Sequence, residues 1–143
     1  MVTMVKMRLM LVDDEERFLQ TTQKLLAKHG YDAIIASGGL ECLQKLQQEL
    51  VHVVILDVKM PDLDGVETLK RIKQKYPLME VIMLTGHATT DSAVEGMKSG
   101  ATDYLVKPTD VEVLIAKAEA AFKRRLDLER KIQMAEALKK SSI

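Results

Sequence analysis

Residues 51–77 read VHVVILDVKMPDLDGVETLKRIKQKYP, and this stretch decides the fold. Residues 51–56 form the most continuous apolar run in the chain, which predicts the central strand of a sheet. Residues 66–75 have the pattern of a helix that ends before Pro77. A buried strand followed by a helix is the repeating unit of a parallel α/β sheet.

The same unit recurs along the chain. The other expected strands are residues 7–12, 31–36, 80–84 and 104–106, and the other expected helices are residues 15–28, 39–49, 90–99 and 110 to about 139. This alternation implies parallel pairing, right-handed crossovers and helices on both faces of the sheet. We therefore expect an α/β fold with a doubly wound, five-stranded parallel sheet and an extended C-terminal helix.

Composition limits the function classes. A chain of 143 residues is long enough for one compact domain, and 47% apolar residues exclude a disordered chain. The 21 basic and 21 acidic residues balance, so the chain as a whole does not attract nucleic acid. Cys42 is the single cysteine, which excludes an internal disulfide. No signal peptide or membrane span is visible, so we expect a cytoplasmic protein.

Polar residues stand where the predicted strands end. Asp13 and Asp14 follow the first strand, Asp57 the third, Thr85 the fourth and Lys107 the fifth. In doubly wound sheets, chemistry collects at the carboxyl ends of the strands. We expect these groups to meet at one edge, where three carboxylates and no His or Cys favour a hard cation such as Mg²⁺.

The carboxylate of Asp57, at the end of the predicted central strand, is suited to attack a phosphoryl group and form an acyl phosphate. Lys107 and the metal would neutralise the charge on the phosphoryl oxygens, and the Thr85 hydroxyl would bind one of them. Asp57, Thr85 and Lys107 are therefore the candidate catalytic residues. His87 lies two residues after Thr85 and either controls water at the site or is simply exposed to solvent.

These residues resemble the receiver domain of two-component response regulators, over residues 7–122. The resemblance rests on Asp13-Asp14, on the stretch LDVKMPDLDG at 56–65, on Thr85-Gly86 and on GATDYLVKP at 100–108. It is closest to receivers of the nitrogen-regulation type, which usually precede an ATPase module and a DNA-binding module. Neither module is in this sequence.

The resemblance implies a flavodoxin-like sheet with strand order 2-1-3-4-5 and a role for each motif. Asp57 would be the phosphoacceptor, served by a sensor histidine kinase. Asp14, Asp57 and the Lys59 carbonyl would bind Mg²⁺, and Asp13 would act largely through water. Thr85 and Tyr104 would be the switch pair, and the Lys107–Pro108 peptide would be cis. The output surface would include Ala88, Val94, Lys98, Tyr104 and Val113.

The last helix is longer than the sheet requires. Thirty residues of helix extend about 45 Å, whereas a domain of this size has a radius of gyration of about 13 Å. Residues 123–143 are therefore expected to protrude as a dimerising coiled coil, a linker helix or a frayed tail, in that order of preference. Leu128, Ile132, Ala135 and Leu138 continue an apolar line along this extension.

Other roles for these residues fit the sequence less well. Asp62 and Asp64 are expected to form a turn and cap the third helix rather than bind metal. A haloacid dehalogenase-like phosphatase or phosphotransferase would also form an aspartyl phosphate, but it needs an aspartate where Lys59 stands. A nucleotide-binding or flavin-binding domain lacks its glycine fingerprint after the first strand. We expect no direct contact with nucleic acid or membrane and no catalysis beyond the protein's own phosphorylation and dephosphorylation.

Overall fold

The computed structural model describes residues 5–86 and 91–141, and the predicted alternation of strands and helices is confirmed. The elements are β1 (Leu9–Val12), α1 (Glu16–Lys28), β2 (Ala33–Ala36), α2 (Gly39–Leu46), β3 (Val53–Asp57), α3 (Gly65–Lys75), β4 (Glu80–Thr85), α4 (Asp91–Lys98), β5 (Asp103–Val106) and α5 (Val111–Ser141). The differences from the predicted bounds are a few residues at element ends, where helices and strands fray.

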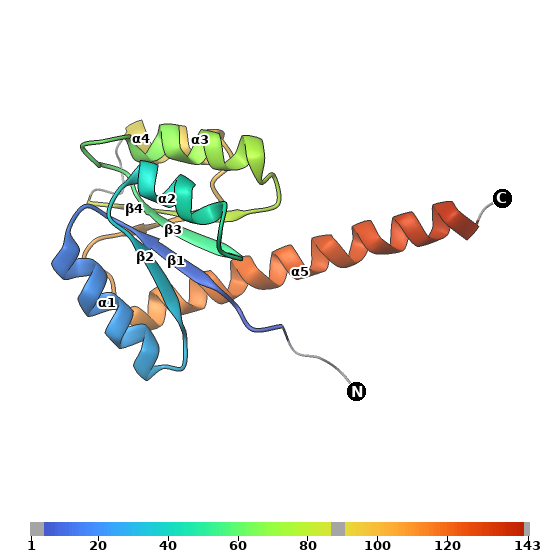
Figure 1. The fold of residues 1–143 in the computed structure, drawn as a ribbon, viewed down its shortest axis with the longest axis horizontal. Helices are drawn as coiled ribbons and strands as arrows, with labels where there is room; N and C mark the ends of the chain where they lie inside the picture. Colours follow the sequence, from blue (N-terminus) through green and yellow to red (C-terminus); the bar gives the residue numbers. More distant parts are fainter. Residues whose placement is uncertain (1–4, 87–90, 142–143) are drawn as a thin grey trace.

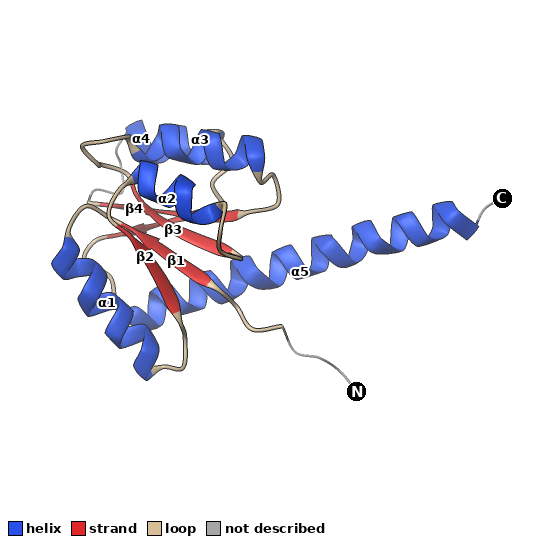
Figure 2. Ribbon diagram, viewed as in Figure 1, coloured by secondary structure: helices blue, strands red, loops and turns tan. Residues whose placement is uncertain are grey.

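The sheet has the predicted order. Its five strands run β2-β1-β3-β4-β5, and each pair is parallel. β3 lies in the centre, as its apolar run predicts, and every residue of this strand is buried. Figure 2 shows the strands between two layers of helices. This is the doubly wound, flavodoxin-like fold.

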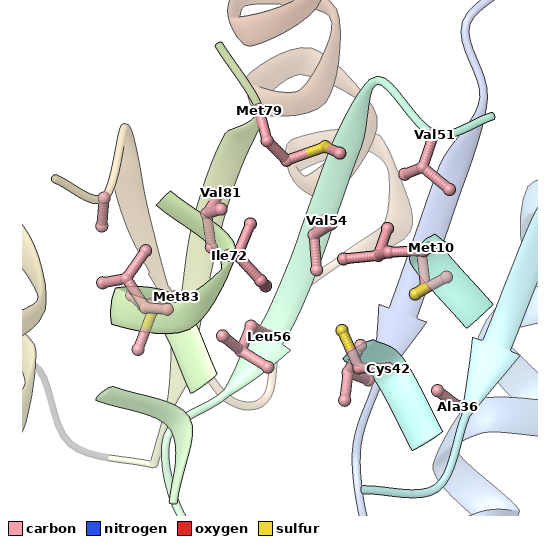
Figure 3. Packing of buried hydrophobic residues seen from close by; sticks show 14 of the residues in the cluster. Met10, Ala36, Cys42, Val51, Val54, Leu56, Ile72, Met79, Val81 and Met83 are labelled. Atoms are coloured by element: carbon pink, nitrogen blue, oxygen red, sulfur yellow. The ribbon is translucent and has the colours of Figure 1, made fainter. Parts of the chain in front are cut away.

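The two faces of the sheet carry separate hydrophobic clusters. In Figure 1, α2, α3 and α4 cover one face, and α1 and α5 cover the other. Val54 and Leu56 of β3 point into the first cluster with Cys42 and Ile72 (Figure 3). Val53 and Ile55 of the same strand belong to the second cluster. Burial on alternate sides explains why β3 reads as an unbroken apolar run.

The loop between β3 and α3 contains one correction to the sequence analysis. Asp64 caps α3 as expected, because its side chain accepts a hydrogen bond from the Glu67 N–H at 2.9 Å. Asp62 does not cap this helix. Its carboxylate accepts from the backbone N–H groups of Gly39 (3.3 Å) and Leu40 (3.1 Å), at the start of α2. Asp62 lies in the bend before α3 as predicted, but its predicted capping of that helix was wrong, because the start of α2 offers unpaired N–H groups that only the folded chain brings near it.

α5 is one continuous helix of 31 residues, as predicted. Its buried residues end at Phe122, and every residue from 131 to 141 is exposed. Figure 1 shows the helix projecting past the end of the sheet at which the strands begin. Within residues 5–86 and 91–141, no helix combines the length and apolar character that crossing a bilayer requires.

Candidate functional site

The structure brings the sequence-predicted groups together at the carboxyl ends of the strands. Asp14, Asp57, Lys59, Thr85 and Lys107 all line one cavity of about 340 Å³. Each is placed by the end of a strand or by the loop that follows it. The remaining lining residues are Glu15, Val58, Gly86 and Ser92.

Three carboxylates meet beside this cavity. Asp13, Asp14 and Asp57 each offer an oxygen, and these oxygens lie within 4.8 Å of one another. Asp13 and Asp57 are buried, whereas Asp14 is exposed. Burial, together with the charge of Asp13, raises the pKa of Asp57 to about 7, although Lys107 and the Lys59 backbone N–H favour its charged form. Burial also raises the pKa of Asp13. At Asp57, burial and the neighbouring carboxylates therefore outweigh the favourable effects of Lys107 and the Lys59 N–H.

The donor set fits a hard divalent cation. The cluster offers carboxylate oxygens from three residues and contains no histidine or cysteine. Oxygen ligands of this kind suit Mg²⁺, which is commonly held by one or two carboxylates together with water and phosphate oxygens. The residues that are present therefore match the metal that the sequence predicts.

Lys107 is held on the β1 side of the site. Its Nζ lies 2.6 Å from Asp13 Oδ2, 3.3 Å from Glu15 Oε1 and 4.5 Å from the centre of the Phe18 ring. Burial lowers the pKa of Lys107, but the hydrogen bond and charge of Asp13 outweigh that effect, and the pKa is raised. The peptide bond between Lys107 and Pro108 is cis, as the resemblance implies.

The switch candidates differ in exposure. Thr85 is 3% exposed and lines the cavity, whereas Tyr104 is 36% exposed, with its ring centre 5.9 Å from Lys117 Nζ. On the predicted output surface, Val94 and Val113 are 53% and 45% exposed, and Lys98 is also exposed. Ala88 and His87 lie outside the described residues, so their predicted roles stay predictions.

Three residues of the site were missed from the sequence. Glu15 and Phe18 contact Lys107, and Ser92 lines the cavity from the first turn of α4. Glu15 could have been suspected because it directly follows the acidic pair. Phe18 and Ser92 carried no such signal, since an aromatic residue in a helix usually belongs to the core and a serine in a first turn usually serves the helix end.

Comparison with known proteins agrees with this arrangement. Residues 9–119 match the response regulator receiver domain family. The chain is 40% identical over 106 residues to the transcriptional regulatory protein ZraR of Klebsiella oxytoca, covering 74% of this chain and 24% of ZraR. It is 36% identical over 110 residues to the DNA-binding transcriptional regulator NtrC of Escherichia coli (strain K12), covering 77% of this chain and 24% of NtrC.

A solved structure supports the same assignment. The crystal structure of a CheY-like response regulator receiver domain protein from Methanospirillum hungatei JF-1 superposes with a TM-score of 0.81 at 30% identity. The match covers 86% of this chain and 98% of that one. The chain spans about a quarter of the length of the curated regulators named above. On its fold, its motifs and these matches, the chain belongs to the response regulator receiver domain family.

Proposed function

We propose that this chain is a phosphorylation-dependent signalling receiver that accepts a phosphoryl group from a sensor histidine kinase onto Asp57. One observation carries the proposal. The buried Asp57 carboxylate ends the central strand within reach of two further carboxylates, and it shares a cavity with Thr85 and Lys107. A nucleophile with this many charged neighbours is suited to a highly charged substrate.

The reaction is a transfer of the phosphoryl group between two nucleophiles. A carboxylate oxygen of Asp57 forms the new bond to phosphorus while the P–N bond to the kinase histidine breaks. The electron pair of the P–N bond stays on the nitrogen of the histidine ring. The Lys107 ammonium and the Thr85 hydroxyl bind oxygens of the transferred group. Bound Mg²⁺ supplies additional positive charge at those oxygens.

We assign the metal to Asp14, Asp57 and the backbone carbonyl of Lys59, with Asp13 acting through water. The close approach of the three carboxylates supports this assignment, because it is otherwise electrostatically unfavourable. The position of Lys59 in the cavity lining supports its inclusion.

Phosphorylation adds negative charge at the end of β3 and draws Thr85 and Lys107 toward it. Tyr104 would then turn inward toward the space that Thr85 leaves. The surface that responds is formed by α4, β5 and the start of α5, where Val94, Tyr104 and Val113 are exposed. This surface would bind a partner or a second copy differently in the two states.

Residues 7–122 form the receiver in this proposal, and residues 123–143 form a C-terminal extension whose described part, through Ser141, is helical. Leu128, Ile132 and Leu138 are 41%, 39% and 67% exposed on the extension, and an unpaired apolar line of this kind suits a second helix. Helical structure through Ser141 fits a coiled coil or a linker helix better than a frayed tail. A dimer that persists in Met134→Asp but is lost in Ile132→Asp, measured by sedimentation with Mg²⁺ and beryllofluoride, would support the coiled coil.

We infer that the chain serves as the regulatory part of a transcriptional regulator in the cytoplasm, since its relatives include proteins named as transcriptional regulators. In this proposal the chain itself contacts no nucleic acid or membrane. It also catalyses only its own phosphorylation and dephosphorylation. The alternative, a phosphatase or phosphotransferase that works through an aspartyl phosphate, is disfavoured by Lys59 at the position where that chemistry needs a carboxylate.

Incubation with acetyl phosphate and Mg²⁺ tests the proposal. Mass spectrometry should find one acid-labile phosphoryl group on the wild type and none on Asp57→Asn, while Asp32→Asn behaves like the wild type. Asp32 is a matched control because its exposed side chain pairs only with Lys6 among the described residues. Phosphoryl uptake by Asp57→Asn would contradict the assignment, and sustained turnover of a phosphate ester would favour the alternative.

A further inference from the structure

The Lys107 ammonium makes contacts that the binding of a phosphoryl group does not require. In the part of the chain that the structure describes, its ion pairs are with Asp13 and Glu15 and not with Asp57. Its ammonium also lies over the Phe18 ring, 4.5 Å from the ring centre. Asp13 and Glu15 lie in the segment that joins β1 to α1, and Phe18 lies in the first turn of α1.

We propose that Glu15 and Phe18 are positioning residues that hold the Lys107 ammonium at rest against the start of α1, from which it must move to bind a phosphoryl group on Asp57. This inference rests on the proposed function, since it concerns how readily the same lysine reaches its phosphoryl ligand. It assigns roles to two residues outside the acidic cluster.

The Phe18 ring is a fixed platform for the ammonium. Phe18 is partly buried and packs against the hydrophobic cluster shared by α1 and α5. The next residue, Leu19, is 1% exposed, which fixes the rotation of the helix and hence the direction of Phe18. A cation within about 6 Å of an aromatic ring centre is attracted by the negative face of the ring. Because packing against this cluster holds the Phe18 ring, we expect the ring to stay in place when the lysine moves.

Glu15 supplies the second, weaker contact. Its backbone is fixed, because its N–H donates to Asp13 Oδ1 at 2.9 Å and its carbonyl accepts from the Leu19 N–H at 3.1 Å. Its side chain is 68% exposed and is therefore free to release the lysine. Exposed ion pairs contribute little each. We expect the contact to change the availability of Lys107 by a small factor rather than to block the reaction.

The ammonium has three N–H donors, of which Asp13 and Glu15 engage two. A phosphoryl group on Asp57 must compete with these acceptors for the lysine. Removing Glu15 or the Phe18 ring should lower the cost of moving the lysine and should strengthen the binding of a phosphoryl analogue. If either residue instead bound the phosphoryl group directly, its removal should weaken the binding of the analogue.

The test is the apparent affinity for beryllofluoride at saturating Mg²⁺, with the initial rate of phosphorylation by acetyl phosphate measured in parallel. Glu15→Gln should bind beryllofluoride about two- to fivefold more tightly than the wild type, as expected for loss of one exposed ion pair. Glu16→Gln removes the same charge from the exposed neighbouring position and should stay near the wild type. The comparison of Glu15→Gln with Glu16→Gln therefore separates the loss of the contact with Lys107 from a general loss of electrostatic repulsion.

Phe18 is tested with a conservative pair. Phe18→Leu keeps an apolar side chain but removes the ring, and it should also increase the beryllofluoride affinity. Phe18→Tyr keeps the ring face and should restore wild-type behaviour, which a purely structural role would not require. Denaturation of each variant confirms that it is folded.

The outcomes separate this inference from the proposed function. If the wild type takes up no phosphoryl group, the proposed function fails. If it does, but Glu15→Gln matches Glu16→Gln and Phe18→Leu matches Phe18→Tyr, the positioning role is wrong. A decrease in affinity for Glu15→Gln alone would also overturn it, because the residue would then assist the bound state.

Discussion

The Arg125 guanidinium of α5 donates from Nη1 to the His52 carbonyl oxygen at 3.2 Å, and also to that of Val51 at 3.0 Å. These carbonyls stand just before β3, at the end of the sheet opposite the candidate site. The His52 ring lies 4.9 Å from the Phe122 ring, one turn earlier in α5. Together these contacts anchor α5 where it leaves the sheet.

We expect Arg125→Met to lower the free energy of unfolding by about 1–3 kcal/mol, since it leaves two partly buried carbonyls without their charged donor. Urea denaturation measures the change. Arg130→Met, at an exposed position on the projecting part of the helix, should change it by no more than about 0.5 kcal/mol. Equal effects of the two substitutions would show that the anchor contributes no stability.

Asp57 should destabilise the metal-free protein at alkaline pH. Because its pKa is raised to about 7 in the folded state, the folded protein binds this proton more tightly than the unfolded chain does. The contribution of this proton to the free energy of unfolding is present at low pH and is lost as the pH rises toward and through 7. Asp57→Asn should therefore unfold with a free energy higher by about 1 kcal/mol or more at pH 8 without Mg²⁺.

The same variant provides the control. At pH 5 the difference between Asp57→Asn and the wild type should shrink, and added Mg²⁺ at pH 8 should stabilise the wild type more than the variant. A difference that does not depend on pH would mean that the burial of Asp57 is not coupled to its ionisation.

His52 should have the opposite pH dependence. Burial, followed by the charge of Arg125, lowers the pKa of the His52 ring, whose Nδ1 accepts the Arg8 N–H at 2.9 Å. The folded protein therefore favours the neutral ring, and its stability contribution is present above pH 6.5 and is lost as the pH falls below that value. His52→Asn retains an acceptor oxygen but does not titrate.

Between pH 7.5 and pH 5.5, the wild type should accordingly lose more stability than His52→Asn. The difference between their urea denaturation curves at the two pH values measures this effect. Parallel losses in the two proteins would show that His52 does not contribute to the acid sensitivity.

Asp62 should stabilise α2 from a distance in sequence. Its carboxylate accepts from the N–H groups of Gly39 and Leu40, so Asp62→Ala should cost about 0.5–2 kcal/mol, as the loss of a helix N-cap does. Hydrogen exchange should also become faster in the first turn of α2. Asp32→Ala, at a side chain that is 82% exposed, should leave both measurements close to the wild type. Faster exchange in α3 instead would indicate that Asp62 caps α3 rather than α2.

Much of the fold was accessible from the sequence because strand and helix periodicity is local. The apolar run that became β3, the glycine and proline stops and the alternation of elements all depend on neighbouring residues. The meeting of Asp57, Thr85 and Lys107 at one cavity could be predicted for the same reason, since each stands at or just after the end of a predicted strand and parallel strands bring their ends to one edge.

Contacts between distant side chains were decided only by the tertiary structure. Asp62 lies 23 residues from Gly39, and Lys107 lies 92 residues from Glu15, so no local pattern could pair them. Packing brings these groups together, and each carboxylate then binds the unpaired donor that packing places nearest to it. The sequence by itself therefore determined the elements and the chemistry at their ends, and the packed fold determined which charge each group meets.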